Sequence, residues 1–290
     1  MTSRPRSRPG LPFVSQPLIP EVRSRPAAMR ILCLHGRGSN NEVLQMQTAA
    51  IRGLLVPEYE FEFVEGRVPH DEGNNWALYT SEFPNSQLYR YYEDHNLDSL
   101  MEIVEELRKM IEEHGPFDGV LGYSSGAFMA ALLVIRSLQD NPFATLAELP
   151  LRFAIFINNG LTPPRVRLLE AGTTVADCDV AAAAATDRLR VISRPDNPSP
   201  LRPGRLPDGR LVLTDGKYYI THHEDCIISI PTLHIYGKAD NMVGATELVD
   251  LCKPEVTLKM LHAFGHDFPH GLDAVRKIAR LIRQTAAMAS

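Results

Sequence analysis

The sequence predicts an α/β fold with a doubly wound, mostly parallel sheet. From position 29 onward, short apolar segments of strand type alternate with longer segments that have helical spacing. Most of the apolar segments are continuous rather than alternating, as in parallel strands buried on both faces. No internal repeat is visible, and 290 residues are enough for one such domain with a large core.

Most of the expected strands are compact apolar runs that end near a glycine, an asparagine or a charged residue. The strands are expected at 30–35, 59–64, 117–121, 152–158, 232–236 and 257–261. The 59–64 segment alternates, and the 152–158 segment has five successive apolar residues at its centre. A further small hairpin is expected around Asp215-Gly216, between the apolar runs 211–213 and 218–220.

The expected helices lie between these strands. They are expected at 41–55, 99–114, 127–135, 243–252 and 270–287. The first shows apolar residues at helical spacing, and Ser99 with Glu102 forms a capping box at the start of the second.

Two long segments interrupt this alternation, and a third precedes it. Residues 1–28 are rich in Arg, Pro and Ser and are expected to be a disordered tail, which leaves 29–290 as the domain. Residues 72–96 hold six large aromatic side chains, for which a substrate pocket and ordinary packing are equally good explanations. Residues 161–230 separate two strands by far more than a usual connection, so they are expected to form an insertion or lid.

Composition excludes several classes of function. The net charge is −5, and because residues 1–28 contribute five Arg and one Glu (+4), the rest of the chain carries −9. No basic surface therefore indicates a nucleic-acid partner. No stretch is long and apolar enough to span a membrane, and the spacing of the four cysteines predicts free thiols rather than disulfides or zinc. We expect a cytoplasmic protein without metal or cofactor.

The segment Gly122-Tyr123-Ser124-Ser125-Gly126 carries the strongest chemical signal. It reads G-x-S-x-G, with an apolar strand before it and a strong helix after it. A serine at such a turn is exposed at the end of the sheet, beside the N–H groups of the helix N-terminus. Ser124 is therefore predicted to be a catalytic nucleophile; the alternative is an idle serine in a glycine-lined turn.

A serine nucleophile needs a base, and the base needs an acid that orients it. In chain order the acid should follow a later strand and the histidine the next one. Asp240 and His266 occupy these places, although Asp240 could instead serve as a turn residue or helix cap. His262 is the second choice for the base.

Other candidates fit less well. His234 lies inside a strand and is expected in the core, His270 is expected at the start of the last helix, and Asp267 should point away. The run 222–225 could suggest a metal site, but adjacent histidines rarely converge on one ion.

The loop that follows the first strand, at 35–39, is expected to supply part of an oxyanion hole. Its glycines allow the backbone to approach a ligand, and the N–H groups of Arg37 and Ser125 are the predicted donors. A phosphate-binding loop is the rival interpretation, but the required G-x-x-x-x-G-K-[ST] pattern is absent.

Four ordered motifs resemble the fungal serine hydrolase family. They are Leu32-Cys33-Leu34-His35-Gly36 with Asn40, the segment 115–124, Leu233-His234-Ile235-Tyr236-Gly237 with Asp240, and Gly265-His266 with Pro269. The match covers nearly all of 29–285, with Ser125 where relatives often have Gln. The resemblance implies an α/β-hydrolase fold and a triad of Ser124, Asp240 and His266, whereas the long insertion 161–230 is less typical of the family.

Members of this family act on esters and thioesters, and some release polyketide acyl chains from a synthase. The resemblance therefore implies an acyl substrate, presented by an acyl carrier protein. Trp76 and Tyr79, in the aromatic segment 72–96, are the candidate pocket residues. A carboxylesterase acting on small or medium esters is the alternative, and a non-catalytic interaction protein is a third possibility.

Overall fold

The computed structural model describes residues 28–70, 86–93, 97–159, 228–240 and 245–290, together with four short strands between 166 and 221. Residues 1–27 of the predicted tail, most of the predicted lid, and both Trp76 and Tyr79 lie outside the described residues.

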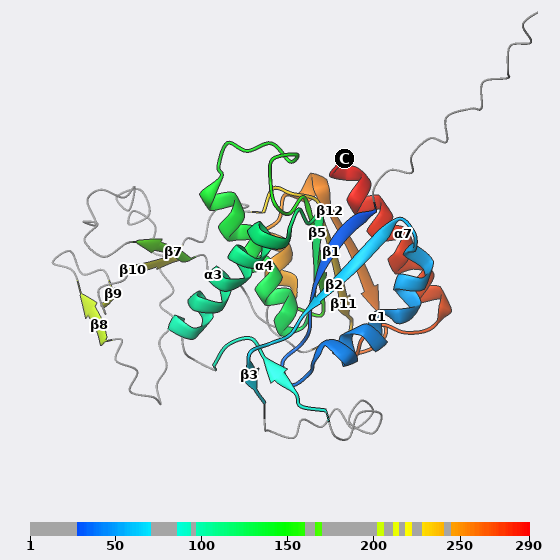
Figure 1. The fold of residues 1–290 in the computed structure, drawn as a ribbon, viewed down its shortest axis with the longest axis horizontal. Coiled ribbons are helices and arrows are strands. Elements are labelled where there is room, and N and C mark those ends of the chain that lie inside the picture. Colours follow the sequence, from blue (N-terminus) through cyan, green and yellow to red (C-terminus); the bar gives the residue numbers. More distant parts are fainter. Residues whose placement is uncertain are drawn as a thin grey trace, which may run out of the picture.

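Six parallel strands form the central sheet (Figure 1), which confirms the predicted doubly wound α/β architecture. The strands are β1 (Met29–Leu34), β2 (Tyr59–Val64), β5 (Gly119–Tyr123), β6 (Phe153–Ile157), β11 (Thr232–Gly237) and β12 (Thr257–His262). Their order is β12-β11-β6-β5-β1-β2, so the chain winds outward from β1 in one direction and from β5 in the other. The switch between these directions, beside the carboxyl ends of β1 and β5, is where α/β folds bind ligands.

Helices cover both faces of the sheet, with α1 and α7 on one side and α3 and α4 on the other (Figure 1). Their bounds are α1 (Asn41–Leu55), α3 (Leu97–His114), α4 (Ser125–Asp140), α6 (Ala245–Asp250) and α7 (Leu272–Met288). Side chains of β1 alternate between the two apolar cores: Leu32 and Leu34 pack with α3 and α4, whereas Ile31 packs with α1 and α7. Burial on both faces explains why the central strands, such as β5 and β6, are continuously apolar.

The predicted cap of the second helix and the predicted hairpin were wrong. Helix α3 begins at Leu97, so Ser99 lies inside it, and its hydroxyl accepts the N–H of Glu93 at 3.1 Å. The expected hairpin does not form either. Strand β9 (Leu211–Thr214) pairs with β8 (Arg202–Arg205), while β10 (Tyr218–Thr221) pairs with β7 (Val166–Leu169).

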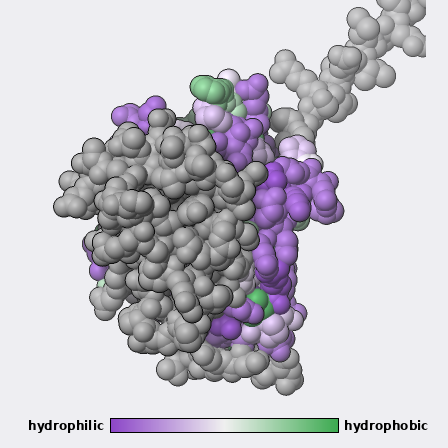
Figure 2. All heavy atoms as spheres, turned by 90° about the vertical axis from the view of Figure 1, so that its left-hand side faces the viewer, coloured by the Kyte–Doolittle hydropathy of each residue, from purple (hydrophilic) through white to green (hydrophobic). Residues whose placement is uncertain are grey.

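Figure 2 shows one face of the molecule. The coloured, described residues on this face are mostly hydrophilic (purple), and hydrophobic residues (green) form only small patches. Among the described helices, none has the length and apolar character required to cross a bilayer. Cys33 and Cys252 are buried free thiols.

Candidate active site

Ser124 occupies a strained turn between β5 and α4. Its backbone has φ 54° and ψ −117°, a conformation that residues other than glycine rarely adopt. The Ser124 N–H donates to the carbonyl of Ile157 at 2.9 Å, which ties the turn to the neighbouring strand β6. Strain of this kind persists only where the surrounding structure enforces it, and it is concentrated at functional sites.

Gly126 shows why the motif needs a small residue after the serine. A Cβ at this position would lie 2.1 Å from the carbonyl oxygen of Leu34, which is far inside van der Waals contact. The first turn of α4 therefore packs directly against the end of β1. This close approach brings the loop after β1 to the side of Ser124.

A chain of hydrogen bonds joins Ser124, His266 and Asp240. The Nε2 atom of His266 lies 2.8 Å from the Ser124 hydroxyl, and its Nδ1 atom lies 3.0 Å from a carboxylate oxygen of Asp240. The Asp240 side chain is only 2% exposed, whereas the imidazole is 18% exposed. The parallel sheet explains the convergence, because the three residues follow the carboxyl ends of β5, β11 and β12.

The rival histidines occupy other environments. His262, at the end of β12, is buried and bonds to Asn158 through Nε2 at 3.0 Å; burial lowers its pKa. His234 lies buried inside β11, as predicted, and burial lowers its pKa to about 3. His270 stacks on Phe264 with ring centroids 3.9 Å apart, while Gly271 precedes α7, so its expected place at the helix start was wrong.

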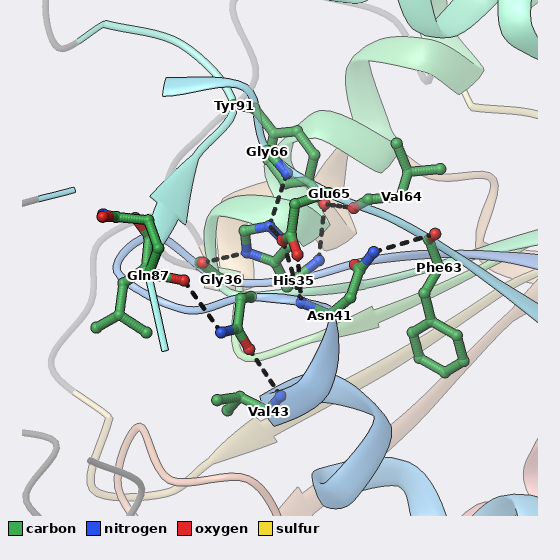
Figure 3. A network of polar contacts seen from close by, with 12 residues as sticks. His35, Gly36, Asn41, Val43, Phe63, Val64, Glu65, Gly66, Gln87 and Tyr91 are labelled. Carbon is green, nitrogen blue, oxygen red and sulfur yellow. Dashed lines mark hydrogen bonds and ion pairs between the residues drawn. The ribbon is translucent and has the colours of Figure 1, made fainter. Parts of the chain in front are cut away.

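The loop after β1 is held by a buried network around His35 (Figure 3). The Nε2 atom of His35 accepts the N–H of Gly66 at 2.9 Å, so the ring proton is on Nδ1 and is donated to the carbonyl of Gly36 at 2.7 Å. The His35 ring also stacks on Tyr91 at 4.8 Å, and its backbone N–H donates to the Tyr91 hydroxyl at 2.9 Å. Tyr91 of the aromatic segment is therefore a packing residue.

This network places the predicted oxyanion loop beside the nucleophile. A Cβ on Gly36 would lie 3.3 Å from the Cβ of Ser124. Strand β4 (Tyr89–Arg90) holds the other side of the loop, because the Gly38 N–H donates to the Tyr89 carbonyl at 2.9 Å. Arg37 is the exposed residue at this turn, and Ser125 begins α4, where first-turn N–H groups have no partner within the helix.

Two side chains that the sequence did not predict as functional bind the backbone carbonyl of His266. Tyr123 donates its hydroxyl to the His266 carbonyl at 2.8 Å, and Asn158 donates to the same oxygen at 2.9 Å. Asn158 has φ 48° directly after β6. An asparagine at the end of a buried strand was the available signal, since this residue tolerates the left-handed region.

No group of three His, Cys, Asp or Glu side chains is placed to hold a metal ion within the described part of the chain. The run 222–225, considered above as a metal site, lies outside the described residues. The described site therefore consists of hydrogen-bonding groups: a hydroxyl, an imidazole, a carboxylate and backbone N–H groups.

The fold and the strand–serine–helix turn define an α/β-hydrolase. The chain belongs to the serine hydrolase family described as "Serine hydrolase (FSH1)", whose model matches residues 24–278, and it is a hydrolase. This finding confirms the resemblance noted in the sequence.

Named relatives cover most of the chain. It is 29% identical over 265 residues to Esterase FPY3 of Fusarium mangiferae, covering 90% of this chain and 98% of that one. It is 28% identical over 286 residues to Hydrolase FUB4 of Fusarium oxysporum f. sp. lycopersici, covering 89% and 98%. A monoacylglycerol lipase from Paleococcus ferrophilus has a TM-score of 0.49 at 12% identity, covering 90% of this chain and 95% of that chain.

Backbone contact between the Asp240 turn and the His266 loop allows a direct test of the site. A Cβ at Gly237 would lie 2.0 Å from the Phe264 carbonyl oxygen and 2.1 Å from that of Gly265. Gly237→Ala should therefore separate the two loops, lower kcat at least ten-fold and cost about 1–3 kcal/mol of unfolding free energy. Steady-state kinetics and thermal unfolding measure the two effects.

Gly265→Ala is the matched control. A Cβ there would meet the nearest atom, the Ala239 carbonyl oxygen, at an ordinary 3.8 Å, so activity should stay within about two-fold of wild type. Equal behaviour of the two variants would contradict the proposed contact between the loops.

Proposed function

We propose that this serine hydrolase cleaves acyl thioesters with Ser124 as nucleophile, His266 as base and Asp240 as the acid that orients it. The observation that carries the proposal is the hydrogen-bonded chain from the Ser124 hydroxyl through His266 to Asp240. Asp240 favours the tautomer of His266 that carries its proton on Nδ1, which leaves Nε2 free to accept the serine proton.

The proposed reaction has two halves. Ser124 Oγ attacks the acyl carbonyl while His266 Nε2 takes its proton, and the N–H groups of Arg37 and Ser125 stabilise the oxyanion. The tetrahedral intermediate collapses, the carbon–sulfur bond breaks, and His266 returns the proton to the leaving thiolate. Water then attacks the acyl-enzyme with His266 again acting as base, and the acid is released with Ser124 restored.

The proposed substrate is a polyketide-type acyl chain delivered as a thioester by an acyl carrier protein. The resemblance to fungal serine hydrolases supports this substrate. A carboxylesterase on small or medium esters is the second candidate, and the similarity to Esterase FPY3 favours it. Purified protein should be offered one acyl group as its thioester and as its oxyester. A kcat/KM at least ten-fold higher for the thioester supports the first candidate, and the reverse order supports the second.

We further propose that the segments 72–96 and 161–230 roof the acyl pocket. Tyr89, which belongs to the segment 72–96, supports this proposal. Its carbonyl accepts the N–H of Gly38, in the loop beside Ser124. Trp76→Ala should then change the ranking of substrates across an acyl chain-length series more than it changes the melting temperature. Phe143→Ala, which removes an aromatic ring that is 98% exposed after α4, is the control and should preserve the ranking. An unaltered ranking for Trp76→Ala would contradict the lid.

A further inference from the structure

We propose that Asn158 is a positioning residue, whose side chain holds the backbone of His266 so that the imidazole stays in line with Ser124. This inference rests on the proposed role of His266 as the base. Asn158 does not touch the reacting atoms, so it would act through the His266 loop.

All polar atoms of the Asn158 side chain are engaged, and the side chain is fully buried. Its Nδ2 group donates one hydrogen to the His266 carbonyl at 2.9 Å and the other to the Asp267 carbonyl at 2.8 Å. Only the amide nitrogen can donate to two carbonyl oxygens, so the position of Nδ2 is fixed and Oδ1 lies on the other side. Oδ1 accepts a hydrogen bond from His262 Nε2 at 3.0 Å. His262 therefore carries its proton on Nε2 and fixes the orientation of the amide.

The backbone of Asn158 is anchored in the sheet. Its N–H donates to the carbonyl of Ile235 in β11 at 2.8 Å, which continues the pairing of β6 with β11. With φ 48°, the chain turns away from the strand there, and asparagine is among the few residues that adopt this conformation readily. One residue thus connects the rigid sheet to the loop that carries the base.

The imidazole of His266 is held from two directions. Asp240 bonds to Nδ1 and fixes the rotation of the ring, whereas Asn158 fixes the backbone from which the ring extends. Tyr123, the neighbour of Ser124, bonds to the same His266 carbonyl and links it to the nucleophile turn. Misplacing a catalytic group by about 1 Å can cost on the order of 10²-fold in rate, which sets the scale expected for losing this contact.

Asn158→Asp is the informative substitution, because it preserves size and tolerance of positive φ but replaces the two N–H donors by an oxygen. We expect kcat per titrated active site to fall about 10- to 100-fold with KM changed by less than about three-fold, since the contact positions the base and not the substrate. Titrating active sites with a fluorophosphonate removes any contribution from misfolded protein.

Measuring kcat over a range of pH distinguishes a positioning role from a purely structural one, because a purely structural role would not make the loss of kcat depend on pH. Burial, the two facing carbonyl oxygens and the nearby carboxylates of Asp240 and Asp267 disfavour the charged form of an introduced aspartate and raise its pKa. The one opposing group is the Nε2–H of His262, and burial keeps that imidazole neutral by lowering its pKa. Its protonated form regains one O–H donor as the pH falls. The ratio of variant to wild-type kcat should therefore rise with decreasing pH.

Asn141→Asp is the matched control. Asn141 also donates its amide to a backbone carbonyl, that of Ser137 at 3.1 Å, but at the opposite end of α4 from Ser124. Its kcat should equal that of wild type at every pH. If Asn158→Asp does not fold, Asn158→Gly, which keeps the backbone conformation, should show the same loss of kcat without the pH-dependent recovery.

Wild-type protein and Ser124→Ala, measured in the same assay, distinguish a failure of the inference about Asn158 from a failure of the proposed function. If wild type turns over, Ser124→Ala does not, and the folded Asn158 variant has wild-type kcat, the inference about Asn158 is overturned while the proposed function stands. An inactive wild type, or an active Ser124→Ala, would overturn the proposed function itself.

Discussion

Ser124→Ala is expected to lower kcat by about 10⁶-fold while the protein keeps its fold, since loss of the nucleophile alone removes most of a triad's rate enhancement. A residual rate of roughly 10³–10⁴ over the uncatalysed reaction should remain from the oxyanion hole and substrate binding. The Ser124 side chain makes no capping bond to α4, and alanine meets the same backbone strain at φ 54° as serine does. The melting temperature should therefore stay close to that of wild type.

Hydrolysis kinetics, fluorophosphonate labelling and thermal unfolding measure this prediction together. Ser137→Ala provides the control, because its hydroxyl is buried in the same helix with no hydrogen-bond partner in the described part of the chain. That variant should be labelled and should turn over at the wild-type rate. Near-normal hydrolysis by a folded Ser124→Ala protein would refute the assignment of the nucleophile.

His266→Ala should be nearly as damaging as Ser124→Ala, with a loss of kcat on the order of 10⁶-fold, because no other group would take the serine proton. Asp240→Asn should cost about 10⁴-fold, since the amide favours the wrong tautomer of His266. His266 lies 2.8 Å from the serine hydroxyl and 3.0 Å from Asp240, which is the geometry these roles require.

His262→Ala is the discriminating control for this assignment. His262 is buried and bonded to Asn158, so it can affect catalysis only through the position of the His266 loop. Its loss should leave kcat within about ten-fold of wild type. Retention of activity by His266→Ala together with inactivation by His262→Ala would reverse the assignment of the base.

The sequence by itself determined the order of the main helices and strands, and most of their bounds to within two residues. The expected helix 41–55 and strand 59–64 agree with the structure residue for residue, because apolar periodicity and turn residues act over short distances. The setting of Ser124 between a strand and a helix was readable for the same reason. Chain order likewise predicted Asp240 and His266 as partners of Ser124, because the acid and base of an α/β-hydrolase occupy the loops after later strands.

Only the tertiary structure decided which segments pair and which side chains support the site. Strands β9 and β10 flank an Asp-Gly pair, yet each pairs with a different strand, because pairing depends on distant segments as well as on the turn between them. Asn158 and Tyr123 lie far from His266 in the sequence, and they reach its carbonyl because β5, β6, β11 and β12 lie side by side in the sheet with their carboxyl ends at one edge. Such contacts leave no periodic signal, because burial and hydrogen bonding at a strand end are properties of the assembled sheet.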